Sequence, residues 1–278
     1  MDIFADKPSE NIAKQLSYRE LGKDASRCLC RGSVYTAMLA SWLFCLLVGV
    51  AAYSFTRVIL ALALLLPLSA TAAEVVSLAV SLLLLALLVM LLMPLLLGRL
   101  RMAGLVLQGE EPIAAECFYY FTSRARLLRA WRGGLVILAL VGLPALILLF
   151  LQQGIWQLYT DVFVFYFNKL IAILLLLGAE LLCLGVAVLL LFAVGVFCTL
   201  PALLVGNEGL CVREALWLAV RQGRAYKEKI FRFSLAALAR LAVCLLLIGV
   251  PLLLWFSHHY LLTYLRFSMA LCPKEDPQ

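Results

Sequence analysis

Long apolar runs separated by shorter polar segments set the pattern of this chain. Five runs, at residues 34–55, 75–98, 133–153, 170–200 and 233–256, are almost free of charged residues. A helix needs about 20 residues to cross about 30 Å of hydrocarbon, and each run meets that length. We therefore predict five membrane spans, the fourth of which is long or kinked and bends at Leu200-Pro201 to run along the inner surface.

The polar segments between these runs predict how the chain is organised. Residues 1–33 form a polar tail, 99–132 and 207–232 form two polar islands, and 257–278 form an outer C-terminal segment with a short interfacial helix. Residues 58–73 are apolar but contain Pro67, which predicts a half-inserted outer segment and not a sixth span. The predicted fold class is an all-α, polytopic transmembrane helical bundle whose transmembrane domain covers residues 34–256.

Each polar island is expected to contain a basic amphipathic helix on the cytoplasmic side. In the first island, Gly109-Glu110-Glu111-Pro112 has the acidic residues and proline that favour a helix N-terminus. Arginines would then close the same helix, where the helix dipole favours cations. A basic amphipathic helix lies along a membrane surface, so we expect contacts with anionic lipid head groups. The candidate residues are Arg124, Arg126, Arg129, Arg132, Arg221, Arg224, Lys227 and Lys229.

Composition strengthens the membrane prediction. The chain is 65% hydrophobic and 14% charged, with a mean hydropathy of +1.04, whereas soluble domains are about 45–50% apolar and about 25% charged. A fold of 278 residues has no interior large enough for this excess, so lipid must be the solvent for most of the chain. The nine cysteines are scattered, which is typical of small hydrophobic residues and not of a disulfide framework.

The distribution of lysine and arginine predicts the orientation of the chain. The tail and each island contain six of these residues, whereas residues 34–98 and 133–206 contain one each, Arg57 and Lys169. The C-terminal segment contains two. Because short cytoplasmic segments carry an excess of lysine and arginine, the alternation predicts a cell-membrane protein with its N-terminus inside and its C-terminus outside.

The two islands resemble each other in sequence. Residues 116–126 align with 214–224 at a constant offset of 98, which matches Glu116 with Glu214, Tyr119 with Trp217 and Arg126 with Arg224. A duplicated helical hairpin in one orientation predicts a parallel repeat about an axis along the membrane normal. The alternative is that any two basic amphipathic helices look alike.

Short motifs also resemble a known family. Arg31-Gly32-Ser33-Val34-Tyr35 leads into the first run, Leu97-Gly98 precedes the first island, and Leu200-Pro201 precedes Arg213-Glu214-Ala215 in the second. In these features, over about residues 25–256, the chain resembles a bacterial multi-pass membrane domain of unassigned function, domain-of-unknown-function family 975. That family closes with a Pro-Tyr pair near the end of its last span, whereas Pro251 has no adjacent tyrosine. The resemblance implies a membrane topology and no activity.

Only two charged residues fall deep within the predicted spans, Glu180 and Arg240. Buried ionisable residues in membranes usually pair with one another, and the two predicted depths nearly meet, so an intramembrane ion pair is one prediction. The alternatives are that Arg240 extends its side chain towards the inner surface and that Glu180 is protonated or faces a small aqueous cleft. His258 and His259 are expected on the outer surface, without a metal.

These features favour a membrane protein without catalytic activity, cofactor or metal. The leading hypothesis is a membrane-organising or partner-binding scaffold that uses its basic inner-face helices. The alternative is a transporter or permease of hydrophobic or amphipathic cargo through a cleft between the repeated hairpins. Expected partners are membrane lipids with anionic head groups, with a protein partner or a homo-oligomer left open. Nucleic acid is excluded because every basic patch lies against the membrane.

Overall fold

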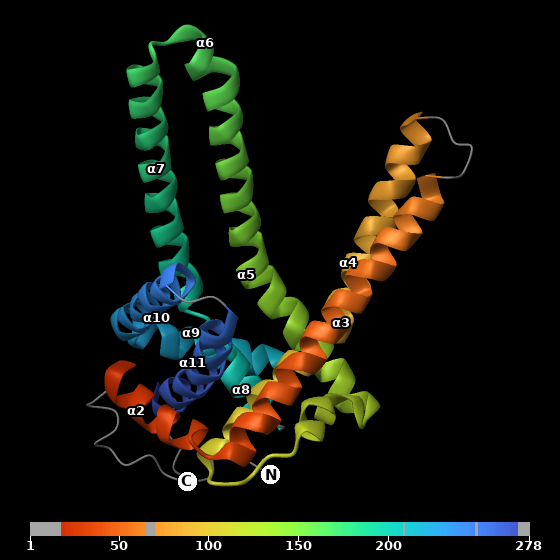
Figure 1. The fold of residues 1–278 in the computed structure, drawn as a ribbon. Coiled ribbons are helices and arrows are strands. Elements are labelled where there is room, and N and C mark those ends of the chain that lie inside the picture. Colours follow the sequence, from red (N-terminus) through yellow and green to blue (C-terminus); the bar gives the residue numbers. More distant parts are fainter. Residues whose placement is uncertain (1–17, 65–69, 208, 248–249, 272–278) are drawn as a thin grey trace.

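Helices account for all the regular secondary structure of the described residues, which confirms the all-α class for that part of the chain. The computed structural model describes residues 18–64, 70–207, 209–247 and 250–271 (Figure 1). In chain order the elements are α2 (Tyr18–Leu29), α3 (Gly32–Leu64), α4 (Ala70–Leu107), η1 (Ala114–Phe121), α5 (Arg124–Leu158), η2 (Tyr159–Phe163), α6 (Val164–Tyr166), α7 (Lys169–Gly195), α8 (Leu200–Gly206), α9 (Val212–Ala225), α10 (Lys227–Leu247) and α11 (Val250–Leu271).

Two long helical hairpins project from a compact base (Figure 1). Helices α3 and α4 form the first hairpin, and α5 and α7 form the second, with η2 and α6 at its tip. We call the remaining elements, α2, η1 and α8 to α11, the base. Both polar islands lie at the base end of the hairpins.

Four segments of the described residues are long and apolar enough to cross a membrane. They are Gly32–Ile59, Ala79–Leu107, Arg124–Tyr166 and Lys169–Gly206, and they overlap the first four predicted spans. Many of their large apolar side chains are exposed, Leu181 and Leu189 to about 70%. Helices of this length with outward-facing apolar residues are compatible with a membrane-embedded protein.

The first hairpin corrects the prediction for residues 58–73. Residues 58–64 continue α3 and residues 70–73 open α4, while 65–69 lie outside the described residues. The predicted half-inserted segment is therefore wrong for the described part. An apolar run without helix breakers favours continuation of the helix, and Pro67, the residue that suggested a break, lies outside the described residues.

The fourth predicted span is interrupted at residues 196–199, just before the predicted position. Helix α7 ends at Gly195, and the chain resumes as α8 at Leu200, with Pro201 in the first turn where proline is tolerated. However, most of α8 is buried against α4, α5 and α9, so the bend leads into the base instead of along a surface.

The predicted fifth span is not confirmed, and the short interfacial helix predicted for the C-terminal segment is wrong for its described part. Residues 233–256 divide between α10, which ends at Leu247, and α11, which begins at Val250. Residues 257–271 belong to α11, where Leu262 and Phe267 are fully buried. This helix packs against α2, α4, α8 and α10, so the described part of the segment is core and not an outer interfacial helix.

The first island does not form the single amphipathic helix that its sequence suggests. Gly109, at φ +88°, ends α4: its N–H bonds the Val106 carbonyl and the Glu110 N–H bonds the Leu105 carbonyl. This is a Schellman cap, which glycine favours because it adopts positive φ without strain. A short 3₁₀ helix, η1, follows, and α5 then begins after Ser123. The arginines expected at a helix C-terminus therefore lie in the first turns of α5.

Candidate functional site

The predicted lipid-contact residues of the first island divide into exposed and engaged side chains. Arg124 and Arg132 are exposed on α5. The Arg126 guanidinium lies 4.1 Å from the centre of the Tyr119 ring and donates to the Thr122 hydroxyl at 3.0 Å. Arg129 donates to the Asn207 carbonyl in the second island. Two of the four arginines are thus engaged in packing the base.

In the second island, α9 presents one basic face to the outside. Its opposite face carries Ala215, Ala219 and Gly223, which are buried at a four-residue spacing. Trp217 is 62% exposed, and the Arg221 guanidinium lies 5.6 Å from its ring centre. Arg224, one turn further along the helix, is also exposed. The small buried residues let α9 pack closely on α8, which leaves the tryptophan and arginines on the surface.

The remaining two predicted cations flank aromatic rings. Lys227 and Lys229 are exposed at the start of α10. The Lys227 ammonium lies 5.9 Å from the centre of the Phe192 ring, and that of Lys229 lies 5.4 Å from the Tyr226 ring. Together with α9, they form a continuous basic stretch along the chain from Arg221 to Lys229, which we call the α9–α10 basic face.

The two copies of the proposed repeat share one local feature. Tyr119 and Trp217, which match at the offset of 98, each carry a guanidinium over their ring. The matched glutamates differ. Glu116 lies 3.9 Å from the Nε of Arg101, whereas the Glu214 carboxylate accepts a hydrogen bond from the N–H of Cys211, the N-cap of α9, whose thiol accepts from the Glu214 N–H. The repeat remains a prediction.

Glu180 and Arg240 do not form the predicted ion pair in the structure. Glu180 accepts a hydrogen bond from the Gln152 amide at 2.7 Å, between α7 and α5. The Arg240 guanidinium instead lies 4.3 Å from the centre of the Tyr18 ring. The depth estimate assumed that α10 continues as a span, whereas the chain divides into α10 and α11 and packs in the base.

A groove of about 790 Å³ surrounds Glu180 inside the second hairpin. Gln152 and Cys183 also line it, and the Cys183 thiol lies 3.7 Å from the Gln152 side-chain oxygen. The other lining residues are leucines and alanines of α5 and α7. Glu180 is the only charged residue among the described residues that line it, and Arg240 is not one of them.

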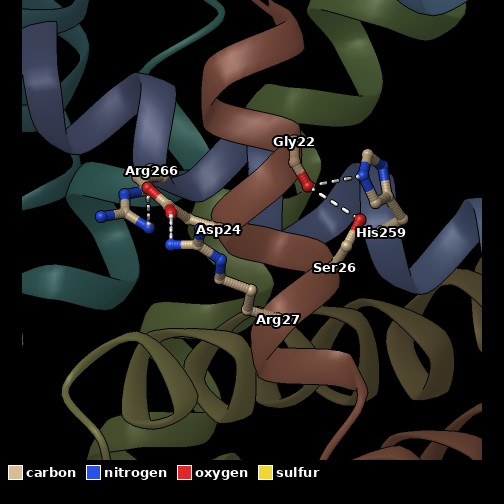
Figure 2. Close-up of polar contacts among 6 residues, drawn as sticks. All are labelled: Gly22, Asp24, Ser26, Arg27, His259 and Arg266. Carbon is tan, nitrogen blue, oxygen red and sulfur yellow. Dashed lines mark hydrogen bonds and ion pairs between the residues drawn. The ribbon is translucent and has the colours of Figure 1, made fainter.

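A polar junction joins α2 to α11 (Figure 2). The Gly22 carbonyl accepts hydrogen bonds from His259 Nε2 at 3.0 Å and from the Ser26 hydroxyl at 2.9 Å. Asp24 lies 3.0 Å from Arg266 and 3.5 Å from Arg27. A Cβ at Gly22 would lie 3.0 Å from the His259 ring, so glycine permits this close approach.

A second polar contact connects α11 with the first hairpin. His258 is fully buried, and its Nδ1 accepts a hydrogen bond from Arg99 Nη2 at 3.3 Å, which places its proton on Nε2. Arg99 also donates to the Ser41 hydroxyl at 3.3 Å. The edge of the His258 ring meets the Tyr35 ring at a centroid distance of 5.8 Å. Both histidines are therefore core residues, in contrast to the outer surface expected from the sequence.

The burial of His258 predicts a pH dependence of stability. Burial, together with the Arg99 charge, lowers the pKa of His258 to about 4, and burial also lowers the pKa of His259. The unfolded chain, with histidine pKa values near about 6.5, therefore binds more protons below that pH. We expect the free energy of unfolding in detergent to be maximal above about pH 6.5 and to fall progressively towards pH 4.

The matched comparison for this pH dependence is His258→Phe, which keeps a ring against Tyr35 but cannot titrate. Thermal unfolding measured between pH 7 and pH 5 should show a shallower slope for this variant than for the wild type. Equal slopes would show that His258 is not the group responsible.

Sequence reasoning missed the residues that join the base. These contacts form only in the tertiary fold, and no periodicity in the sequence marks the residues that make them. The residues are Asp24, His258, His259 and Arg266. Arg99 was counted as part of the first polar island, although it is only 9% exposed. The sequence offered one signal for these contacts, the adjacent pair His258 and His259 in a segment with several other polar residues.

Comparison of the chain with protein-family models, with curated proteins and with solved structures gives no match. The resemblance to domain-of-unknown-function family 975 therefore stays a prediction.

Proposed function

We propose that the protein is a non-catalytic integral membrane protein whose base organises anionic lipids of the cytoplasmic leaflet. One observation carries this proposal: large apolar side chains are exposed along the hairpins, whereas the exposed cations of both islands lie on the base or in the first turns of α5, at the base end of the second hairpin. Anionic lipids attract cations next to a membrane by about 1 kcal/mol per residue. The same face is available to a protein partner or to a second copy of the chain.

The proposed orientation places the base on the cytoplasmic side and the hairpin tips outside. The tips carry few cations, Arg57 and Lys169, whereas the base carries the islands, as the distribution of positive charge favours. The Asp24–Arg266 contact puts the end of α11 beside α2. In this topology Leu271, the last described residue, is therefore on the same side as α2.

Helix α9 is suited to lie at the head-group level. Tryptophan is favoured at membrane–water interfaces, and Trp217 is exposed beside Arg221 and Arg224. The buried face of α9 fixes the helix to the base, so the basic face is presented in a defined orientation and needs no ordering when lipid binds.

Removing the charges of the α9–α10 basic face tests the proposal. The variant Arg221→Gln, Arg224→Gln, Lys227→Gln, Lys229→Gln should bind phosphatidylglycerol at least about tenfold more weakly, because four favourable interactions are lost. The measurement is the number of lipids retained in native mass spectrometry across a lipid titration. The control Arg57→Gln, Lys169→Gln removes charge at the tips and should bind as the wild type does. Equal retention by all three proteins would contradict the proposal.

A second candidate function is transport of an amphipathic cargo, for which the groove around Glu180 provides the supporting observation. Its lining is apolar apart from Gln152, Glu180 and Cys183, which fits a hydrocarbon chain with one hydrogen-bonding group. Movement of a fluorescent lipid across vesicles containing the protein, and its loss in Glu180→Leu, would favour this candidate over the first.

A further inference from the structure

A pocket of about 480 Å³ lies where α2, α10 and α11 meet, away from the α9–α10 basic face and from Glu180. Three polar residues line it, Ser26, Arg240 and His259. Most of the remaining wall is apolar and includes Val243, Trp255 and Phe256. This volume falls within the range of pockets that hold small ligands.

Arg240 is the charge that defines the pocket. Its guanidinium packs on the Tyr18 ring, and the side chain is exposed. Among the described side chains, no carboxylate pairs with it. Asp24, an acidic residue on the adjacent helix α2, is already within 3.5 Å of Arg27 and 3.0 Å of Arg266. A guanidinium has five N–H donors, so contact with Tyr18 leaves donors of Arg240 for a planar or tetrahedral anion.

The two other polar residues are already engaged. The Ser26 hydroxyl and His259 Nε2 both donate to the Gly22 carbonyl, so neither of these hydrogens is available to a ligand. Arg240 is thus the main attraction for an anion. The apolar wall beside Arg240 favours a ligand that also has an apolar part, since a simple ion would make no apolar contact with Trp255 and Phe256.

We propose that this pocket binds an anionic amphiphile. Its phosphate or carboxylate head contacts Arg240, and its hydrocarbon chain lies along Val243, Trp255 and Phe256. The site is independent of the proposed function, because it shares no residue with the α9–α10 basic face. Loss of surface lipid binding in the fourfold variant therefore leaves the pocket intact.

The test measures binding of two probes, a fluorescent fatty acid and a fluorescent lysophosphatidic acid, to the full chain in an uncharged detergent. Arg240→Gln should weaken the binding of both probes at least tenfold, and Arg240→Lys should restore part of it. The control Arg57→Gln removes an exposed arginine outside both the pocket and the α9–α10 basic face, and it should bind both probes as the wild type does. Because Arg240 is exposed, thermal unfolding should show that Arg240→Gln is folded.

Two competitors separate the sources of the signal. Inorganic phosphate at millimolar concentration should not displace either probe, and a fatty alcohol of equal chain length should bind at least tenfold more weakly than the fatty acid. Displacement by phosphate, equal binding of the alcohol, or unchanged probe binding by Arg240→Gln would each overturn the proposal.

Discussion

Replacing Gly98 or Gly223 with alanine is expected to lower the free energy of unfolding by about 3 kcal/mol or more, because each added methyl group would collide with backbone. A Cβ at Gly98 would lie 2.7 Å from the Cys117 carbonyl carbon in η1. At Gly223 it would lie 2.6 Å from the Val196 carbonyl carbon, just beyond α7. These two glycines bring η1 against α4 and α9 against the end of the second hairpin. Backbone atoms cannot move aside as the end of a side chain can. The added methyl group would therefore push η1 away from α4, or α9 away from the end of α7.

Gly178 and Gly185 provide the matched control within the apolar part of α7. A Cβ at either position meets nothing within 4 Å, and both lie in the helix interior. Alanine there should leave stability unchanged or raise it by up to about 1 kcal/mol, since glycine weakens a helix relative to alanine. Thermal unfolding of the purified variants in detergent measures the difference. Wild-type stability of Gly98→Ala would show that η1 does not pack on α4 in this way.

Phe267→Ala is expected to destabilise the protein by about 3–5 kcal/mol, the range for a large aromatic side chain removed from a core. Phe267 is fully buried, and its ring stacks on Phe233 at a centroid distance of 4.2 Å. The substitution removes this contact between α11 and α10 and leaves a cavity among the helices of the base.

Phe165→Ala is the control for Phe267→Ala. Phe165 is 79% exposed at the tip of the second hairpin, so its loss should change stability by less than about 0.5 kcal/mol. If residues 257–271 formed an outer interfacial helix, the two substitutions would have similarly small effects. Urea or thermal unfolding in detergent distinguishes the two cases.

The long apolar helices of the hairpins, though not their pairing, could be predicted from the sequence because their signal is local. Runs such as 133–153 and 170–200 contain almost no charge, and a helix satisfies all of its own backbone hydrogen bonds. An interruption near Leu200-Pro201 was predictable for the same reason, since proline acts on its own neighbours in the chain, although the break lies at residues 196–199 and the proline is in the first turn of α8.

The position of α11 could not be predicted because its signal is tertiary. His258, Thr263, Arg266 and Ser268 interrupt its apolar residues and lower its hydropathy below that of a span. Three of these four are buried, and Arg266 reaches Asp24 of α2. Taken alone, this mixture of polar and apolar residues predicts a partly exposed helix. The same residues can be buried when neighbouring helices supply hydrogen-bond partners for the polar side chains.

In the first island, a glycine is compatible with either the start or the end of a helix. Gly109 before two glutamates and a proline fits a helix start, but glycine at positive φ equally ends a helix. The geometry of α4 decides between the two. The predicted ion pair between Glu180 and Arg240 was wrong because the depth of each residue in the membrane was counted along the chain. That count assumes that both helices cross the membrane in parallel.

The central claim is that both hairpins point away from a base that includes α2 and α11. Single cysteines at Glu110, at Asp161 and after Gln278, in a chain with its nine native cysteines replaced, test it with a membrane-impermeant maleimide. Glu110 is exposed beside η1 and Asp161 is exposed at the tip of the second hairpin. The account predicts that Glu110 and the C-terminal cysteine react from the cytoplasmic side and Asp161 from the outside. Reaction of the C-terminal cysteine from the same side as Asp161 would contradict it.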